Sequence, residues 1–406
     1  MRNHSIRWLV VLALVIFGMG VFTSTAPAKD IIFMDLSDYT GPVAGLALPG
    51  SMGTEDYLKY INNKGGVEGL KIKYMGIDTR YDVARAISAF KRQRRNKQVV
   101  AVGIVSTPVG KMMQALTKKE KLVVHVPGDG EFQAHPGNFF TWGPVYQDAF
   151  AATIDWIMDD WEKKGESGKP KVAVLSWDNA YGREMLRGGK EYAEMKGAQL
   201  LPSELFPTGT LKHDVYLTRL DKAGANYVYV GGVDPVQTNV MRDATALGLT
   251  EKIQFISDYW GPTALGISLH PKALEGMVVV SFFLRGQEAF DHPLLKELWT
   301  TVRKQPMDKF NEGYGIGVGA GINLVGAVTD TVKRVGKNKV TREEVHNSYL
   351  RLTGLDRQGL AGRCTYSPTR RAGADVVKFY KVTGGKIVPI TDWVQTPDAV
   401  SMHKWK

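Results

Sequence analysis

The sequence predicts an α/β fold of parallel sheets with helices on both faces. Short apolar runs, typical of buried strands, alternate with helical patterns, and this alternation falls into two similar runs, about 30–140 and 146–275. Strands that are joined by helices lie parallel, and the helices cover both faces of the sheet. The 406 residues are 44% hydrophobic and 23% charged, which is ordinary globular composition and enough length for two or three domains.

The first run starts with a short apolar strand over 31–34, which the turn Thr40-Gly41-Pro42 ends. A helix over about 50–63 ends at Gly65-Gly66, and Asp82 stands where an N-cap precedes a helix over 83–95. The remaining elements expected in this run are strands over 70–77, 99–105 and 122–126, and a helix over 111–119.

The second run repeats this order. Its expected helices cover 145–161, 182–196, 211–223 and 236–247, and its strands cover 171–176, 199–206, 227–231 and 253–257. Residues 163–170 are rich in Lys and Gly and indicate a surface loop rather than a domain boundary. The rest of the chain predicts a strand over 276–283, helices over 293–305, 314–335 and 342–352, and a strand-rich end that includes 376–381.

The first 28 residues have the pattern of a cleavable secretory signal peptide. Arg2 and Arg7 precede the uncharged apolar segment 8–22, and Ala26-Pro27-Ala28 ends the pattern with small residues at the cleavage positions. This apolar segment is shorter than the ~20 residues that span a bilayer, and no later stretch is expected to span one. We therefore expect a soluble, periplasmic mature protein that starts at Lys29.

The sequence lacks the motifs of several classes of enzyme, metal site and cofactor site. Cys364 is the only cysteine, which excludes an intrachain disulfide, a CxxC zinc site and a cysteine-ligated iron–sulfur cluster. The eight histidines show no metal-ligand spacing. No nucleophile elbow, phosphate-binding loop or zinc-protease motif occurs, so we expect neither a metal nor a cofactor. The net charge of +11 includes the basic cluster 91–95, but no aromatic residues interleave with it, and a solvated helix end is expected rather than a nucleic-acid site.

A glycine pattern late in the chain resembles a dinucleotide fingerprint only loosely. Gly315, Gly317 and Ala320 fit G-x-G-x-x-A, but they lie inside a helical pattern and follow no strand. We interpret these small residues as a place where two helices pack closely.

The loops that follow the predicted strands form the candidate binding site. Ligands of open parallel sheets bind beyond the carboxyl ends of the strands, where hydroxyls, aromatic rings and helix N-termini can hold a small polar solute. Turns and N-caps favour the same residue types, so a single loop would indicate little. Five loops share this position: 106–108, 128–130, 178–182, 231–235 and 258–261.

An ordered set of short motifs resembles the periplasmic type I solute-binding proteins of the branched-chain amino acid (Leu/Ile/Val) class. The motifs are Thr40-Gly41-Pro42-Val43-Ala44, Asn62-x-x-Gly65-Gly66-Val67-x-Gly69, Asp82-x-x-Arg85-Ala86, Asp178-x-x-Tyr181-Gly182-Arg183, 227–232 and 246–249. The resemblance covers nearly the whole mature chain.

The resemblance implies two doubly wound parallel-sheet lobes joined by a three-crossover hinge, with the ligand enclosed between them. We expect an N-terminal lobe of 29–143 plus about 281–352, and a C-terminal lobe of 144–280 plus about 353–406. It also implies delivery of the ligand to the membrane permease subunits of an ABC transporter. We expect the protein to be a monomer.

The resemblance also implies ligand-binding residues. Ser106 and Thr107 match the loop that supplies hydroxyls to a ligand carboxylate, Gly128 and Asp129 match the next loop, and Tyr181 would line the cleft from the second lobe. Further candidates are Tyr39, Leu46 (at the position of an aromatic wall), Asp234, Asp258 and Trp260.

One departure from the family pattern bears on the ligand. The acid that receives an α-ammonium is replaced by Val236, which cannot pair with a buried charge. We therefore expect an aromatic or aliphatic acid, or an amide, rather than a branched-chain amino acid held in the usual way. The alternative is that Asp129 or Asp234 replaces the missing acid.

Two other functions stay open from the sequence. An exported α/β hydrolase would need a nucleophile and a base, and Ser106 and His125 both lie near strand ends. A ligand sensor would present its closed form to a receptor instead of a permease. The expected function is solute binding without catalysis.

Overall fold

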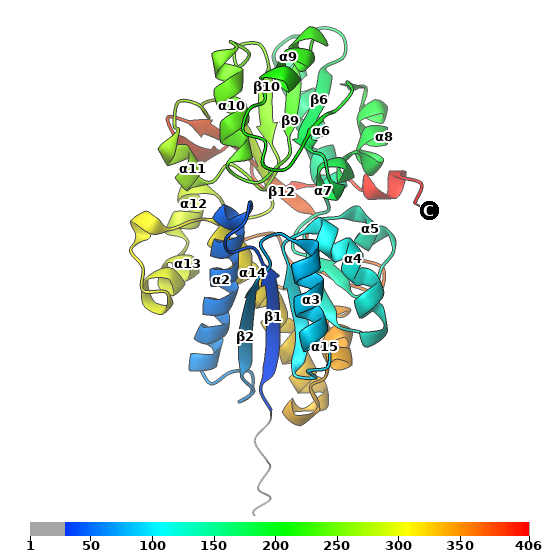
Figure 1. Cartoon of the computed structure of the whole chain (residues 1–406), viewed down its shortest axis with the longest axis vertical. Helices are drawn as coiled ribbons and strands as arrows, with labels where there is room; N and C mark the ends of the chain where they lie inside the picture. The colour runs from blue at the N-terminus through cyan, green and yellow to red at the C-terminus, as the bar shows by residue number, and fades with distance from the viewer. Residues whose placement is uncertain (1–28, 406) are drawn as a thin grey trace, which may run out of the picture.

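The N-terminal sheet is five-stranded and parallel, with the order β2-β1-β3-β4-β5. The computed structural model describes residues 29–405, so the predicted signal peptide lies outside the described residues. Figure 1 shows this sheet in the lower lobe. The strands are β1 (Ile31–Ser37), β2 (Ile72–Asp78), β3 (Val99–Ile104), β4 (Val123–Val126) and β5 (Phe139–Thr141).

Two layers of helices cover this sheet, because successive side chains of its strands point to opposite faces. Ile31 and Phe33 pack in a core with α2, α14 and α15, whereas Ile32 and Met34 pack in a core with α3 and α4. The helices of the lower lobe are α2 (Ala44–Asn63), α3 (Val83–Gln93), α4 (Thr107–Thr117), α5 (Gly130–Ala134), α14 (Gly313–Val335) and α15 (Arg342–Tyr349).

The second sheet has the order β13-β12-β11-β10-β9-β6-β7, with β8 beside β6 and β14 beside β12. Its strands are β6 (Lys171–Trp177), β7 (Gln199–Leu200), β8 (Glu204–Phe206), β9 (Tyr227–Val230), β10 (Gln254–Ser257), β11 (Val278–Ser281), β12 (Val376–Thr383), β13 (Lys386–Pro389) and β14 (Val394–Gln395). The strands β12, β13 and β14 pair antiparallel, so this sheet is mixed. The antiparallel hairpin of β12 and β13 turns at Gly384 and Gly385, which both have positive φ, as tight hairpins require.

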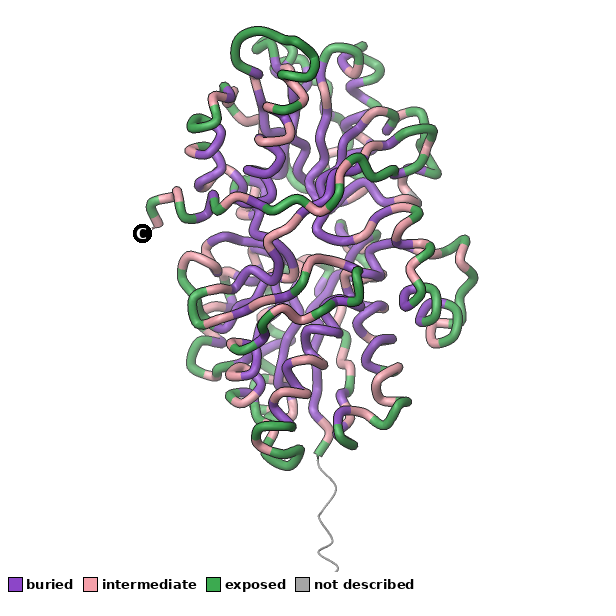
Figure 2. The backbone as a smooth tube through the Cα atoms, turned by 180° about the vertical axis from the view of Figure 1, so that it is seen from behind, coloured by how far each residue is buried: buried purple, intermediate pink, exposed green. Residues whose placement is uncertain are grey.

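The remaining helices surround the second sheet and the junction between the lobes. They are α6 (Tyr146–Lys163), α7 (Ala180–Glu184), α8 (Leu186–Lys196), α9 (Asp214–Lys222), α10 (Val236–Ala246), α11 (Ala264–Leu269), α12 (Gly286–Asp291) and α13 (Pro293–Glu297), which continues as a π-helical turn, Leu298–Val302. Short 3-10 turns cover Lys118–Glu120, Met307–Lys309, Lys337–Lys339 and Val400–Met402. Figure 2 shows the buried residues concentrated along the strands of both lobes, with exposed residues in the outer loops.

The chain passes between the lobes three times. The first crossing links β5 to α6, the second links β11 to α14, and the third links α15 to β12. Cys364 and Tyr366 pack in the core of the lower lobe, and the Tyr366 hydroxyl donates to the carbonyl of Thr141 at 2.8 Å. The third crossing therefore comes after Tyr366, later in the chain than the expected position near 353.

The helices α2 and α14 approach so closely that only glycine fits at their contact. A Cβ on Gly317 would lie 1.7 Å from the carbonyl oxygen of Gly50, and one on Gly53 would lie 2.0 Å from that of Tyr314. Within the glycine pattern, Gly317 is therefore the residue at which the two helices pack closely, as interpreted from the sequence.

The helix α14 corrects one expectation from the sequence. By length and composition it is apolar enough to cross a membrane, although no stretch after the signal peptide was expected to be. It is mostly buried inside the fold, where it packs against α2 and α15. Its hydrophobicity is that of a central core helix.

Candidate functional site

A cavity lies between the lobes at the carboxyl ends of the strands of the lower sheet. It holds about 740 Å³ of empty space, a volume that includes the open solvent at its mouth. The lining comes from both lobes and from the first crossing, and most of it is apolar or aromatic. The lining residues are Phe33, Asp35, Val43, Leu46, Ala47, Gly50, Ser51, Thr54, Tyr81, Gly103, Val105, Thr107, Trp142, Tyr146, Tyr181, Val233, Trp260, Ile316, Gly317 and Ala320.

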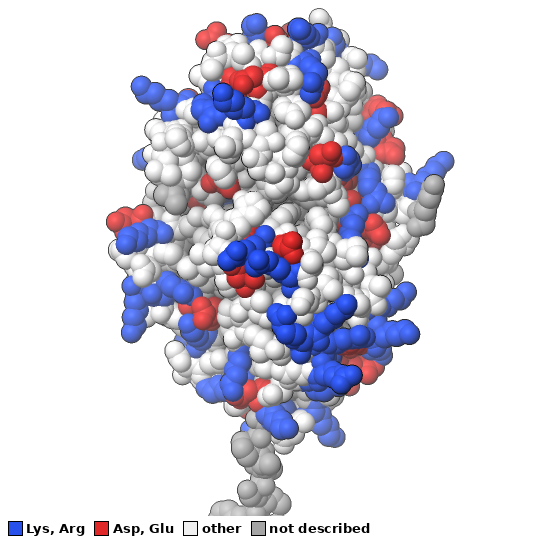
Figure 3. Space-filling model, viewed as in Figure 1, with Lys and Arg blue, Asp and Glu red and all other residues white. Residues whose placement is uncertain are grey.

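Charged side chains stay outside this cavity, with one exception. Figure 3 shows Lys and Arg gathered on the outside of the lower lobe, and in the cluster 91–95 all four basic side chains are exposed, as expected of a solvated helix end. Inside the cavity no Lys, Arg or His is among the described lining residues, and Asp35 is the only acid there.

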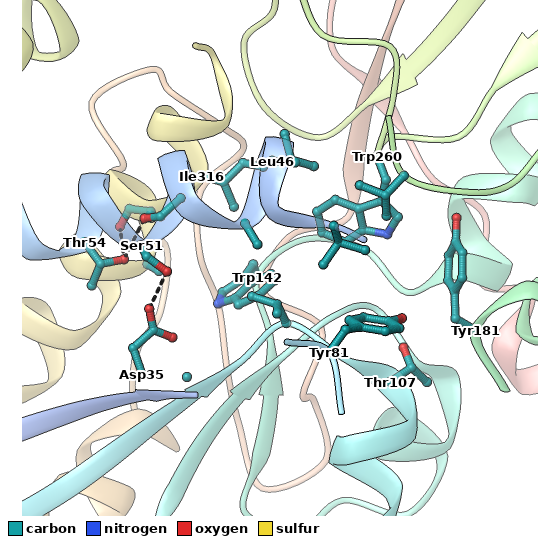
Figure 4. A pocket seen from close by; sticks show the side chains of 18 of the residues that line it. Asp35, Leu46, Ser51, Thr54, Tyr81, Thr107, Trp142, Tyr181, Trp260 and Ile316 are labelled. Carbon is teal, nitrogen blue, oxygen red and sulfur yellow. Dashed lines mark hydrogen bonds between the residues drawn. The ribbon is translucent and has the colours of Figure 1, made fainter. Parts of the chain in front are cut away.

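Asp35 lies on β1 at one end of the cavity, with a fractional exposure of 5%. The Ser51 hydroxyl of α2 and the Tyr74 hydroxyl of β2 both donate to its Oδ2, at 2.7 Å each, and Figure 4 shows Ser51 beside it. Burial raises the pKa of Asp35, while the two hydrogen bonds act in the opposite direction.

Tyr81, Thr107 and Tyr181 lie toward the other end of the cavity, with Trp142 between them and Asp35 (Figure 4). Thr107 opens α4, and the preceding Ser106 caps that helix by accepting a hydrogen bond from the Val109 N–H at 3.4 Å. Ser106 and Thr107 therefore take separate positions: Ser106 serves the helix end, and Thr107 lines the cavity.

Four of the predicted site residues line the cavity: Leu46, Thr107, Tyr181 and Trp260. The Tyr181 ring faces the cavity, while its hydroxyl accepts from the Gly232 N–H at 2.7 Å and donates to Asp258. The Trp260 indole donates to the Tyr146 hydroxyl at 3.1 Å. Both rings are thus fixed by hydrogen bonds within the upper lobe.

The other six predicted residues are not among the lining residues: Ser106, Gly128, Asp129, Tyr39, Asp234 and Asp258. The Tyr39 hydroxyl is hydrogen-bonded to Tyr74 at 3.0 Å, and Asp258 is the buried partner of Tyr181. Gly128 lies against the upper lobe, since a Cβ there would be 2.4 Å from the Tyr259 hydroxyl. Their part in ligand binding stays a prediction.

The two acids expected to substitute for the missing ammonium ligand are already engaged. Asp129 forms an ion pair with Lys111 at 3.2 Å and accepts from the Glu131 N–H at 2.9 Å. Asp234 accepts from the Thr263 hydroxyl at 2.7 Å. Both residues have partners in the protein that a ligand would have to displace.

Ser106 and His125 are also committed to other partners. Nε2 of His125 lies 2.5 Å from the Tyr349 hydroxyl, and the ring is fully buried. Burial, with the nearby Arg357 as a second cause, lowers the pKa of His125 to about 3, so the ring is neutral. Since the Ser106 hydroxyl serves the end of α4, the structure gives the hydrolase alternative no nucleophile–base pair at this position.

Several lining residues did not emerge from the sequence, chiefly Asp35, Ser51, Tyr81, Trp142 and Tyr146. One signal was available for Asp35, because an acid inside an otherwise apolar strand needs a specific partner or function. Across residues 29–405, no group of three or more His, Cys, Asp or Glu side chains is arranged to hold a metal ion.

Two α/β lobes joined by three crossings, with a cavity between them, define a periplasmic binding protein of type I. The chain belongs to the periplasmic binding protein family, whose model matches residues 36–386. This match confirms the resemblance and the fold class that the sequence predicted.

Known relatives agree with this assignment. The Leu/Ile/Val-binding protein homolog 3 of Brucella melitensis is 22% identical over 94% of this chain and 99% of its own length. A branched-chain amino acid ABC transporter structure from Thermus thermophilus with bound valine has a TM-score of 0.81 at 21% identity, covering 92% of this chain and 98% of its own. A solute-binding protein from R. palustris in complex with benzoate has a TM-score of 0.73 at 17% identity, covering 91% and 99%.

Proposed function

We propose that this protein is the extracytoplasmic substrate-binding component of an ABC importer of the branched-chain amino acid type. It captures a small organic solute (an amino acid, or a related carboxylate or amide) and delivers it to membrane permease subunits, as a monomer and without catalysis. The observation that carries this proposal is the cavity lined from both lobes, with an apolar and aromatic wall and few polar groups.

The lobes act as rigid bodies about the three crossings. A ligand that touches both lobes stabilises the closed form by its differential affinity for it. We assign residues 29–143 and 281–352 to the N-terminal lobe and 144–280 with the end of the chain to the C-terminal lobe. Residues 353–366 join the N-terminal lobe, because Cys364 and Tyr366 pack in its core.

Leu46, Thr107, Tyr181 and Trp260 contact the ligand directly. Valine and benzoate, the ligands named for two structural relatives, both combine an apolar body with a charged head, and this chain offers an apolar wall of similar character. Ser106 contributes by holding the N-terminus of α4, which carries Thr107.

The proposal is tested on protein isolated from its native host. We expect N-terminal sequencing to start at Lys29, the protein to fractionate with the periplasm, and mass spectrometry of the denatured protein to find a released small solute. X-ray scattering should give a smaller radius of gyration after that solute is added back to stripped protein. An unchanged radius with a tightly bound solute, or a solute returned chemically altered, would contradict the proposal.

A further inference from the structure

One end of the cavity is built around the buried carboxylate of Asp35. Gly103 of the neighbouring strand β3 leaves room for it, since a Cβ there would lie 2.8 Å from Oδ1 of Asp35. Ser51 and Tyr74 hold the carboxylate in place from two other elements, and the Tyr39 hydroxyl in turn contacts Tyr74. The side chain is therefore fixed in orientation before any ligand arrives.

The two carboxylate oxygens of Asp35 have different surroundings. Both hydrogen bonds end on Oδ2, and no described residue donates to Oδ1. No basic side chain is among the described residues that line the cavity with it. A nine-tenths buried carboxylate that faces a cavity without a cation is costly, because desolvation is not offset by a partner charge.

We propose that Asp35 receives a protonated nitrogen of the ligand, so that the transported solute is an organic amine with an apolar body. This inference rests on the proposed function and names the substrate class of the same cavity. The position differs from that of Val236, which lies on α10 of the other lobe. The missing ammonium ligand is thus replaced from the N-terminal lobe, and the solute need not be an acid or an amide.

The surroundings suit such a head group. Phe33 and Trp142 contribute aromatic rings to the same cavity, and ring faces attract a desolvated cation. The Trp142 Nε1–H is buried, no described residue accepts its hydrogen bond, and in Figure 4 the indole nitrogen lies on the side of Ser51 and Asp35. Its hydrogen-bonding capacity is therefore not used by any residue that the structure describes.

The test compares head groups on matched bodies by calorimetry at neutral pH. The aromatic probes are benzylamine, benzamide and benzoate, and the aliphatic probes are isobutylamine, isobutyramide and isobutyrate. We expect wild-type protein stripped of ligand to bind the amine of at least one trio tenfold or more tightly than its amide and its acid. Preference for the acids or amides, or no binding of either amine, would overturn the inference.

Variants then test whether the preference for an amine depends on Asp35. Asp35→Asn is expected to reduce amine binding at least tenfold and to leave amide binding within about twofold. Asp148→Asn is the matched control, because Asp148 is also a buried carboxyl but lies outside the cavity, where it accepts from the N–H groups of Ala399 and Val400. Equal amine binding by Asp35→Asn and wild type would overturn the inference, and the head-group comparison on wild type stands even if Asp35→Asn fails to fold.

Failure of this inference is distinguishable from failure of the proposed function. If an acid or amide binds and reduces the radius of gyration, the importer proposal holds and only the amine assignment is wrong. If a bound solute leaves the radius unchanged, the proposed function itself fails.

Discussion

Ser106 and Thr107 are adjacent residues for which the structure predicts different effects. The Ser106 hydroxyl caps α4, whereas Thr107 lines the cavity. We expect Ser106→Ala to lower the free energy of unfolding by about 1 kcal/mol, as loss of an N-cap does, with little change in affinity. Thr107→Ala should weaken binding of the co-purified solute roughly tenfold, because a hydrogen bond in a closed cavity is lost.

Chemical denaturation and calorimetry on both variants separate these effects. A large loss of affinity in Ser106→Ala with unchanged stability would restore the ligand role that the family resemblance implied for Ser106.

Asp148 provides a pH prediction at the same scale. Burial raises its pKa to about 7, so the folded state holds a proton that the unfolded chain releases near pH 4. The stability that this group contributes is therefore fully present below about pH 4 and is lost as the pH rises through 7. We expect Asp148→Asn to remove that part of the pH dependence, measured as the wild-type-minus-variant difference in unfolding free energy between pH 4 and 8. A difference that is flat, or that rises with pH, would contradict the raised pKa.

At the scale of elements, two glycine positions on α14 allow a test of its close packing against α2. A Cβ on Gly317 would lie 1.7 Å from the Gly50 carbonyl, whereas one on Gly319 would lie 3.8 Å from the nearest atom, Cδ of Arg357. Gly317→Ala should cost about 1–3 kcal/mol or more through overpacking. Gly319→Ala should be neutral or should stabilise by up to about 1 kcal/mol, because alanine favours the helix.

Thermal and denaturant unfolding of the pair measures this difference. Equal stability of the two variants would show that the helices move apart at little cost.

The helices and strands also show which parts of the fold could be predicted from the sequence and which could not. The alternation of strands and helices was sufficient for the parallel strands of both sheets, because hydrophobic periodicity is a local property. The late third crossing was not predictable, since nothing local indicates that Cys364 and Tyr366 pack against the first sheet. The antiparallel strands β12 and β13 were likewise left unpaired, although Gly384-Gly385 is a hairpin signal.

The residues of the candidate site likewise divide into those that the sequence predicted and those that it did not. Loops after strands were found by position, which brought Thr107, Tyr181 and Trp260 to the cavity. Asp35 was missed because it lies within a strand, and only the fold shows that its side chain faces the cavity beside Ser51. Asp129 seemed available for a ligand because its partner Lys111, eighteen positions earlier in the chain, could not be inferred from spacing.

At the scale of the whole molecule, a cluster of ion pairs joins the two lobes beside the cavity. Lys111 of α4 contacts Asp129 at 3.2 Å and Glu131 at 3.1 Å in its own lobe, and Glu184 of α7 in the other lobe at 3.1 Å. Arg187 of the upper lobe reaches Glu131 at 3.3 Å. Asp129 and Glu184 are almost fully buried, so closure places their charges where only these cations neutralise them.

Lys111→Met should therefore shift the protein toward its open form. Removing the cation leaves Asp129 and Glu184 buried side by side without their shared partner, which is far more costly than losing a surface ion pair. Opening separates Glu184 from Asp129 and lets water reach both, so the open form is affected less. We expect a larger radius of gyration of the ligand-free variant by X-ray scattering, and at least tenfold weaker binding of the co-purified solute.

Arg183→Met is the matched control on α7, because Arg183 pairs with Asp178 at the exposed surface and should change neither quantity. If Lys111→Met behaves like this control, the cluster of ion pairs contributes nothing to closure. In that case the lobes are held together by contacts across the cavity alone, such as those of Leu46 with the core of the upper lobe.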